Sequence, residues 1–127
     1  MTPAEIDALA ARFFAAIAAG DVDAVASCYA DDAVVWHNYD QVDQPKADNL
    51  KVLAWLVGAV PDLSYDEIRR TVVDRAFVQQ HVLRGTAPDG TPVEVPAMMR
   101  VEVAEGCITR VEEYLDTAQV APLRRGR

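Results

Sequence analysis

The second half of the chain consists of segments rich in β-branched residues, separated only by short turns. There are four of them, Leu63–Asp74, Ala76–Ala87, Thr91–Glu105 and Cys107–Asp116. Asp-Arg, Pro-Asp-Gly and Glu-Gly sequences lie at the joints, and such residues favour tight reversals. Because a parallel crossover needs about a dozen residues or more, neighbouring segments must pair antiparallel. The sequence therefore predicts a four-stranded meander, and the length of the segments predicts a bent sheet.

The first half of the chain is expected to be mainly helical. Thr2, Pro3 and Glu5 form the pattern of a capping box, which begins a helix. Apolar residues then follow at helical spacing, and Pro61 stops the third helix. Helices are predicted up to about Ala19, from Asp21, over Ala47–Val60 and over Thr117–Leu123, with one strand over Ala33–Asn38.

This order of elements predicts an α+β fold in a single domain over residues 1–123, with an Arg-rich tail over residues 124–127. In the expected architecture, a curved and mostly antiparallel sheet wraps around helices in a cone shape. Helices on the inner side of a bent sheet leave a central pocket in which a small ligand can sit. A chain of 127 residues is too short for two domains with separate cores.

The chain is acidic, with a net charge of −8 from 12 Lys and Arg against 20 Asp and Glu. An acidic surface repels phosphate backbones, so nucleic acid is not an expected partner. No apolar run approaches the roughly 18 residues that a membrane span needs, and the N-terminus lacks the pattern of a signal peptide. No membrane partner is therefore expected, and the predicted location is the cytoplasm.

The cysteines and histidines do not form a metal-binding pattern. Cys28 and Cys107 lie far apart with no CxxC spacing, so buried free thiols are predicted rather than a disulfide or a metal pair. His37 and His81 have opposite expected directions on their strands, which disfavours a zinc site. The nucleotide-binding and hydrolase motifs GxGxxG, GxSxG and HExxH are absent. Neither a metal nor a cofactor is expected.

Glu113 interrupts an apolar face of the last predicted strand. Residues two apart on a strand share a face, so Glu113 lies between Val111 and Leu115. Burial of a carboxyl group raises its pKa toward the range useful for proton transfer. Glu113 is therefore a candidate catalytic acid or base, and a solvated Glu at a strand edge is the alternative.

The Ala76–Ala87 segment shows the same pattern. Gln79 and His81 share a face with Phe77 and Leu83. A carboxylate that faces an imidazole can orient the ring and adjust its pKa. We therefore predict that His81 is the catalytic partner of Glu113 and that Gln79 orients substrate or water. A structural histidine is the alternative.

The first strand places Trp36 and Asn38 on one face and His37 on the other. Trp36 is expected to form an aromatic wall of the pocket, and Asn38 is expected to anchor a ligand or water as part of the catalytic set. The alternative makes Trp36 a core residue and Asn38 a turn residue. The direction of His37 stays open, because one bulge would exchange it with its neighbours. The remaining residues expected to line the substrate site are Phe14, His37, Leu83, Met98 and Met99.

Both ends of the chain resemble a known superfamily. Phe13–Asp23 followed by Tyr29–Val34 resembles the opening of nuclear transport factor 2-like proteins, and Gly106–Asp116 resembles the final strand of their SnoaL-like branch. The resemblance implies a cystatin-like or nuclear transport factor 2-like cone with a pocket inside it. It also implies a homodimer through the outer face of the sheet. Because this fold hosts many functions, the resemblance indicates the fold more than the activity.

Three enzyme groups within this resemblance can be compared position by position. The catalytic positions of ketosteroid isomerases match Phe13, His37 and Met98, which lack the required groups, so that activity is not expected. Limonene-type epoxide hydrolases and SnoaL-like polyketide cyclases fit better, because the side chains expected inside the cone match their sites in position or kind. The epoxide-hydrolase positions match Trp36, Asn38, Gln79, His81 and Glu113, and the cyclase set resembles Asn38, His81 and Glu113.

Two classes of function remain open. The first is a cofactor-independent enzyme that transfers a proton on a small hydrophobic substrate, by isomerisation, cyclisation or addition of water. Its catalytic residues would be Glu113, His81 and Asn38. The second is a non-catalytic domain that binds a hydrophobic ligand or acts as a dimeric accessory domain, in which the same polar groups form a satisfied buried network.

Overall fold

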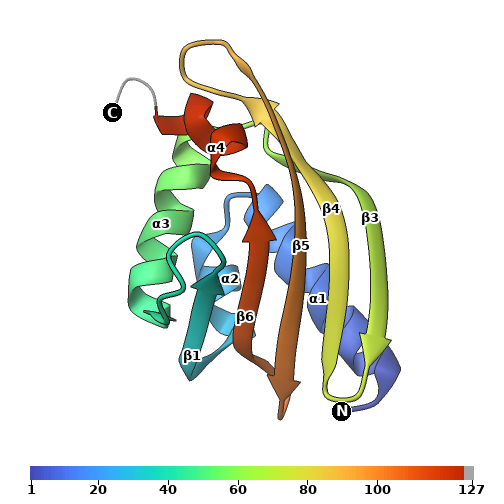
Figure 1. The fold of residues 1–127 in the computed structure, drawn as a ribbon. Helices are drawn as coiled ribbons and strands as arrows, with labels where there is room; N and C mark the ends of the chain where they lie inside the picture. Colours follow the sequence, from blue (N-terminus) through green and yellow to red (C-terminus); the bar gives the residue numbers. More distant parts are fainter. Residues whose placement is uncertain (125–127) are drawn as a thin grey trace.

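The protein is described by a computed structural model over residues 1–124, in which helices pack against one large sheet (Figure 1). The helices are α1 (Pro3–Ala18), α2 (Val22–Cys28), α3 (Lys46–Ala59) and α4 (Thr117–Arg124). The strands are β1 (Tyr29–His37), β2 (Gln44–Pro45), β3 (Ser64–Val73), β4 (Ala76–Thr86), β5 (Pro92–Ala104) and β6 (Cys107–Leu115). Of the predicted Arg-rich tail, Arg124 is the last residue of α4, and residues 125–127 lie outside the described residues.

The sheet is mixed and has the strand order β2-β1-β6-β5-β4-β3. Strands β3 to β6 pair antiparallel in sequence order, which confirms the predicted meander. Strand β1 pairs parallel with β6 and thereby brings the first half of the chain into the sheet. The α+β architecture with a curved, mostly antiparallel sheet is therefore confirmed.

Helix α1 forms as its capping box predicts and covers the inner face of the sheet. The Thr2 hydroxyl accepts a hydrogen bond from the Glu5 backbone N–H at 3.1 Å, and the Glu5 carboxylate accepts one from the Thr2 backbone N–H at 2.8 Å. The helix ends as predicted at Ala19, and Gly20 follows with a left-handed φ of 72°. Its buried face packs against apolar residues of the sheet in one core, which includes Leu9, Phe13, Phe77, Val101 and Ile108.

Strand β1 begins earlier than predicted. It starts at Tyr29 rather than at Ala33, directly after α2. Its pairing with β6 shifts register between Tyr29 and Val34, a stretch that contains the exposed residues Asp31 and Asp32. From Ala33 onward the strand alternates regularly, and Ala33 and Val35 are buried.

A bulge in β3 changes which of its residues face inward. Asp66 pairs with Val82, but Arg69 already pairs with Gln80, so the intervening stretch of β3 has one residue more than β4. Within this stretch Glu67 adopts a left-handed φ of 52°. The extra residue shifts the period-two alternation, and Tyr65 and Arg70 consequently both reach the inner face of the sheet.

Two other expectations can be compared with the fold. Both cysteines are free, but only Cys28 is fully buried, because Cys107 lies half-buried at the start of β6. Across residues 1–124, the helices are too short or too polar to cross a lipid bilayer.

The residues that follow α3 pack closely against β4 at Gly85. A Cβ atom at this position would collide with Cγ1 of Val60 and would lie 3.2 Å from Oδ1 of Asp62. Val60 is buried and follows the last turn of α3. The missing side chain of Gly85 therefore leaves the space that Val60 occupies against β4.

We expect Gly85→Ala to destabilise the protein by about 1–3 kcal/mol, because the added methyl group overpacks this contact. Gly58→Ala is the matched control, since a Cβ atom there meets nothing within 4 Å. On α3 the same change should raise stability by about 0.5 kcal/mol. Urea unfolding followed by tryptophan fluorescence measures both values. Equal stability of the two variants would show that the α3–β4 contact can relax.

Candidate functional site

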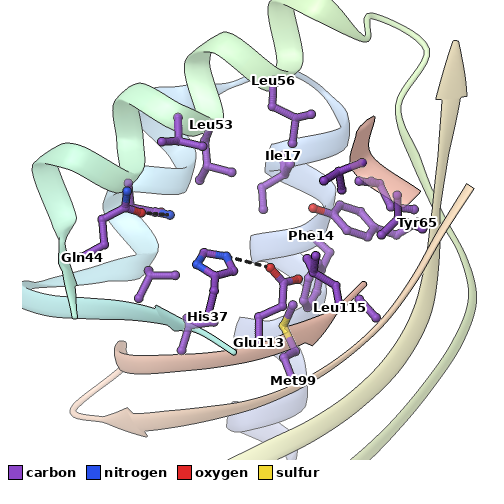
Figure 2. Close-up of a pocket in the computed structure, with 18 of the residues that line it drawn as sticks. Phe14, Ile17, His37, Gln44, Leu53, Leu56, Tyr65, Met99, Glu113 and Leu115 are labelled. Atoms are coloured by element: carbon purple, nitrogen blue, oxygen red, sulfur yellow. Dashed lines mark hydrogen bonds and ion pairs between the residues drawn. The ribbon is translucent and has the colours of Figure 1, made fainter. Parts of the chain in front are cut away.

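A cavity of about 210 Å³ lies between the inner face of the sheet and helices α1, α3 and α4. Its walls are mainly apolar, and Figure 2 shows Ile17, Leu53, Leu56 and Met99 around it. Such a volume, below the roughly 300–1,000 Å³ of typical drug-sized pockets, suits a small molecule. Polar groups enter the cavity at only a few places, so each of them has a large influence on what can bind.

Glu113 and His37 form a hydrogen-bonded pair in the cavity wall. They are Cα partners in the parallel β1–β6 ladder, and their side chains project to the same side (Figure 2). Nε2 of His37 lies 3.0 Å from Oε1 of Glu113. An ionised carboxylate only accepts hydrogen bonds, so His37 is the donor. Both side chains line the cavity, and their exposures of 16% and 19% show that neither is fully enclosed.

The ring of His37 is also fixed by its neighbour Tyr39. The two rings stack with centroids 5.0 Å apart and an angle of 26° between their planes. The imidazole thus contacts Tyr39 on its face and Glu113 at its edge, and the hydrogen bond is accepted by Oε1 of the carboxylate. A ligand would therefore meet Glu113 at Oε2.

His81 reaches the cavity from β4 and is almost fully buried, with 3% exposure. Nε2 of Gln79 lies 2.8 Å from Nδ1 of His81. The ring packs edge-on against Phe14 and Tyr65, with centroid distances of 5.5 and 4.8 Å. Burial lowers the pKa of His81, and the negative charge of Glu113 partly opposes this shift. The imidazole is consequently neutral near pH 7.

Tyr65 is a polar residue of the cavity that the sequence analysis missed. Its hydroxyl group points into the cavity from β3 (Figure 2). Burial raises the pKa of Tyr65 well above its ordinary value, and the charge of Glu113 adds to the shift. The hydroxyl group therefore stays protonated and is available as a hydrogen-bond donor. Tyr65 reaches this face only because of the bulge in β3. The sequence has no glycine at the bulge that would have indicated it.

A second polar chain in the cavity wall joins Tyr29, Asn49 and Gln44. The Tyr29 hydroxyl donates to Oδ1 of Asn49 at 2.8 Å, and Nδ2 of Asn49 donates to Oε1 of Gln44 at 3.1 Å. Burial raises the pKa of Tyr29, which keeps its hydroxyl group protonated as the donor. These groups are largely occupied by one another, so the chain ties α3 to β1 rather than offering groups to a ligand.

The prediction that Trp36 and Asn38 face the pocket is wrong. Trp36 lies on the outer face of the sheet and packs against Tyr114 at a centroid distance of 5.4 Å. Oδ1 of Asn38 accepts a hydrogen bond from the Leu115 backbone N–H at 3.0 Å, which fastens the end of β1 to β6. The alternation of β1 turns Val35 and His37 inward, so the open question about His37 is resolved in favour of the cavity.

Two further assignments need correction. Met98 is 44% exposed and lies on the outer face, opposite Tyr114 in the β5–β6 ladder. Met99 lines the cavity instead, because it pairs with Glu113 on β6. Gln79 is fully buried and contacts His81 from behind the cavity wall, without reaching the cavity itself.

The remaining predicted site residues are brought together in one cavity. The residues in question are Phe14, His37, His81, Leu83, Met99 and Glu113. The expected pairing of Glu113 with His81 is replaced by the hydrogen bond between Glu113 and His37. Glu113 acts on His81 through its charge. Within residues 1–124, no cluster of three His, Cys, Asp or Glu side chains has the geometry to hold a metal ion.

Comparison with known proteins identifies the class to which this fold and cavity belong. A family model described as a SnoaL-like domain matches residues 10–111, most of the chain. The chain therefore belongs to the family of SnoaL-like domains. Among curated proteins, none matches this sequence significantly.

Solved structures with the same fold are distant in sequence. A candidate isomerase from Bacillus subtilis has a TM-score of 0.84 at 16% identity, covering 100% of this chain and 98% of that one. AclR, a candidate hydroxylase from Streptomyces galilaeus, has a TM-score of 0.84 at 16% identity, with 99% and 89% covered. A candidate SnoaL-like polyketide cyclase from Shewanella denitrificans has a TM-score of 0.77 at 14% identity, with 99% and 100% covered. These likenesses establish the fold.

We expect the imidazole of His81 to titrate below the ordinary histidine pKa of 6.5, because burial disfavours its charged form. Glu113→Gln should lower this pKa further, since the variant removes the charge that opposes the shift. NMR titration of His81 in the wild-type protein and in the variant measures both pKa values. Below about pH 6.5, His81 takes up a proton more readily in the unfolded chain than in the folded protein. The free energy of unfolding should therefore also fall as the pH drops below about 6.5. An unchanged His81 pKa in Glu113→Gln would contradict the coupling.

Proposed function

We propose that this protein is a cofactor-independent enzyme that transfers a proton on a small, largely apolar substrate. The observation that carries the proposal is a carboxylate held by an imidazole inside an apolar cavity, with further hydrogen-bond donors on the same walls. Apolar walls would bind the body of the substrate and exclude water. The few polar groups would then act on the reacting atoms in a medium where electrostatic interactions are strong.

Glu113 is the proposed general base. Oε1 accepts the hydrogen bond from His37, which fixes the carboxylate and leaves Oε2 to face the substrate. Oε2 would remove a proton from a carbon atom next to a carbonyl group. The electron pair of the broken C–H bond moves toward the carbonyl oxygen and forms an enolate. In a substrate with a β,γ double bond, return of the proton from Glu113 to the γ-carbon completes an isomerisation. In a substrate with a second carbonyl group, attack of the enolate carbon on that group forms the ring bond and an alkoxide, and return of the proton from Glu113 to the alkoxide oxygen completes a cyclisation.

Tyr65 and His81 are the proposed donors to the enolate oxygen. Their rings are in contact at 4.8 Å, and both residues line the same cavity as Glu113. The Tyr65 hydroxyl is protonated because burial raises its pKa, and His81 is neutral because burial lowers its pKa. Each can donate a hydrogen bond without giving up its proton. Removing one such donor costs about 10²–10³ in rate in well-studied enzymes.

The alternative function is binding of a hydrophobic ligand without chemistry. The same cavity would serve it, with the His37–Glu113 pair as a satisfied polar contact in the wall. The fold neighbours described as a candidate isomerase and a candidate polyketide cyclase support the catalytic proposal as analogies. The structural argument for catalysis is that Glu113 remains reachable from the cavity although it is paired.

The proposal is tested with a simple ketone that fits the cavity. We expect the protein to accelerate exchange of the methyl protons of acetophenone for deuterium in D₂O, measured by NMR. Glu113→Gln should reduce this acceleration by about 10²-fold or more, as expected for loss of a positioned base. Tyr65→Phe should reduce it about 10²-fold, because one donor to the enolate is lost.

Glu112→Gln is the matched control. Glu112 is the adjacent residue of β6, and its carboxylate accepts a hydrogen bond from Arg110 instead of joining the cavity. This variant removes the same charge from the same strand and should exchange acetophenone at the wild-type rate. Binding of acetophenone with no exchange above the buffer rate would favour the non-catalytic alternative. Equal rates for the Glu113→Gln and Glu112→Gln variants would remove Glu113 from the mechanism.

A further inference from the structure

Behind the cavity wall, a chain of hydrogen bonds runs from the protein surface to His81. Nε of Arg70 donates to Oδ1 of the exposed residue Asp7 at 2.8 Å, and Nη1 of Arg70 donates to Oε1 of Gln79 at 2.8 Å. Nε2 of Gln79 then lies 2.8 Å from Nδ1 of His81. Of the residues in this chain, the proposed mechanism uses only His81. It gives no role to Arg70 or Gln79.

The chemistry of the three side chains fixes the direction of every hydrogen bond in this chain. A guanidinium group carries only donors, so the amide of Gln79 must turn its oxygen toward Arg70. Its NH₂ group then faces His81, and Nδ1 must accept the hydrogen bond. A neutral imidazole with an accepting Nδ1 carries its proton on Nε2. Protonation of Nδ1 would bring two donors face to face.

We propose that Arg70 and Gln79 are positioning residues that hold His81 as the neutral Nε2–H tautomer, so that it donates a hydrogen bond to an uncharged carbonyl oxygen in the cavity. Nδ1 is occupied by Gln79, so Nε2 is the ring nitrogen left for a ligand. His81 lines the cavity among Phe14 and Tyr65. The ligand class is a small apolar molecule with a carbonyl group.

The bulge in β3 is what brings Tyr65 to the same face of the sheet as Arg70. Without the extra residue, Arg70 would still pair with Gln79, but Tyr65 would fall opposite Arg84 and face outward. With the bulge, Tyr65 pairs with Leu83, and both Tyr65 and Arg70 lie on the inner face beside His81. One irregularity thus places the second donor next to the histidine whose tautomer Arg70 controls.

Arg70 is suited to this task because it is itself held on both sides. Its side chain is 15% exposed, lies between α1 and the sheet, and is paired with Asp7 of α1. Burial of the fully enclosed amide of Gln79 requires that its oxygen and its NH₂ group both have partners. Rotation of the amide would turn its NH₂ group toward Arg70 and leave two donors in contact. The orientation is therefore strongly specified.

Gln79→Glu tests this assignment directly. The new carboxylate accepts from Arg70 and from Nδ1–H of His81, so in the neutral imidazole the proton should move from Nε2 to Nδ1. Proton–nitrogen NMR correlations of the ring distinguish the two tautomers, recorded at a pH where the imidazole is neutral. We expect the Nε2–H tautomer in the wild-type protein and the Nδ1–H tautomer in the Gln79→Glu variant. The same tautomer in both proteins would overturn the proposal.

Arg70→Met is the second variant, since it keeps Gln79 and removes the donor that orients its amide, together with the ion pair to the exposed Asp7. The amide can then rotate, and a mixture of both tautomers is expected. Gln80→Glu is the matched control, because it adds the same charge on the exposed face of β4, one residue away. It should retain the Nε2–H tautomer. A single Nε2–H tautomer in the Arg70→Met variant would show that Arg70 has no positioning role.

Ligand binding provides the functional readout, with acetophenone and α-methylstyrene as probes. The hydrocarbon has a CH₂ group in place of the carbonyl oxygen and otherwise the same shape. The ratio of ketone affinity to hydrocarbon affinity should fall about fivefold in the Gln79→Glu variant and stay unchanged in Gln80→Glu, as expected for one lost hydrogen bond. An unchanged ratio in both variants would contradict the donor role of His81.

This inference rests on the proposed function for the identity of the bound oxygen, yet the two can fail separately. Absence of acetophenone exchange would remove the catalytic proposal while leaving the tautomer and the affinity ratio as measured. Conversely, a wild-type His81 with its proton on Nδ1 would remove the positioning role even if exchange is fast and depends on Glu113.

Discussion

A polar side chain can remain on the inner face of this sheet only if it has a hydrogen-bond partner there, and this constraint shapes the site. Among the described residues, every fully buried polar side-chain atom has such a partner. The sheet meets the requirement with Glu113 bonded to His37, and with Arg70, Gln79 and His81 bonded in series. The partners also fix the orientation and protonation of the groups that face the cavity.

Much of the architecture could be predicted from the sequence because its signals are local. The capping box at Thr2, the helical spacing of apolar residues and the tight turns between the last four strands each act over a few residues. The inward direction of His81 and Glu113 could be predicted as well, since β4 pairs with β5 without a break and β6 alternates regularly around Glu113. Regular strands preserve the period of two on which such arguments depend.

The rest of the site could not be predicted, for two different reasons. Strand β1 alternates regularly from Val34 onward, but alternation alone does not say which face is the inner one, and the large ring of Trp36 suggested an inner wall although it packs outside against Tyr114. In β3 the bulge places Glu67 in a left-handed conformation. Glycine is the residue that most often adopts this conformation, and the sequence has none there. Faces within Leu63–Asp74 were not assigned from the sequence, and counting alternate residues across this bulge would have placed Tyr65 and Arg70 on opposite faces.

The two histidines of the chain show how the partner, rather than the residue type, determines the role. His37 faces an acceptor, so its Nε2 proton is directed at Glu113 and holds the base in place. His81 faces a donor at Nδ1, so its Nε2 proton is left for the cavity. Exchanging Gln79 for an acidic residue would make the second histidine resemble the first, with no change in the fold. Function in SnoaL-like domains should therefore be compared through the partners of inward-facing residues, since overall similarity establishes only the shared sheet.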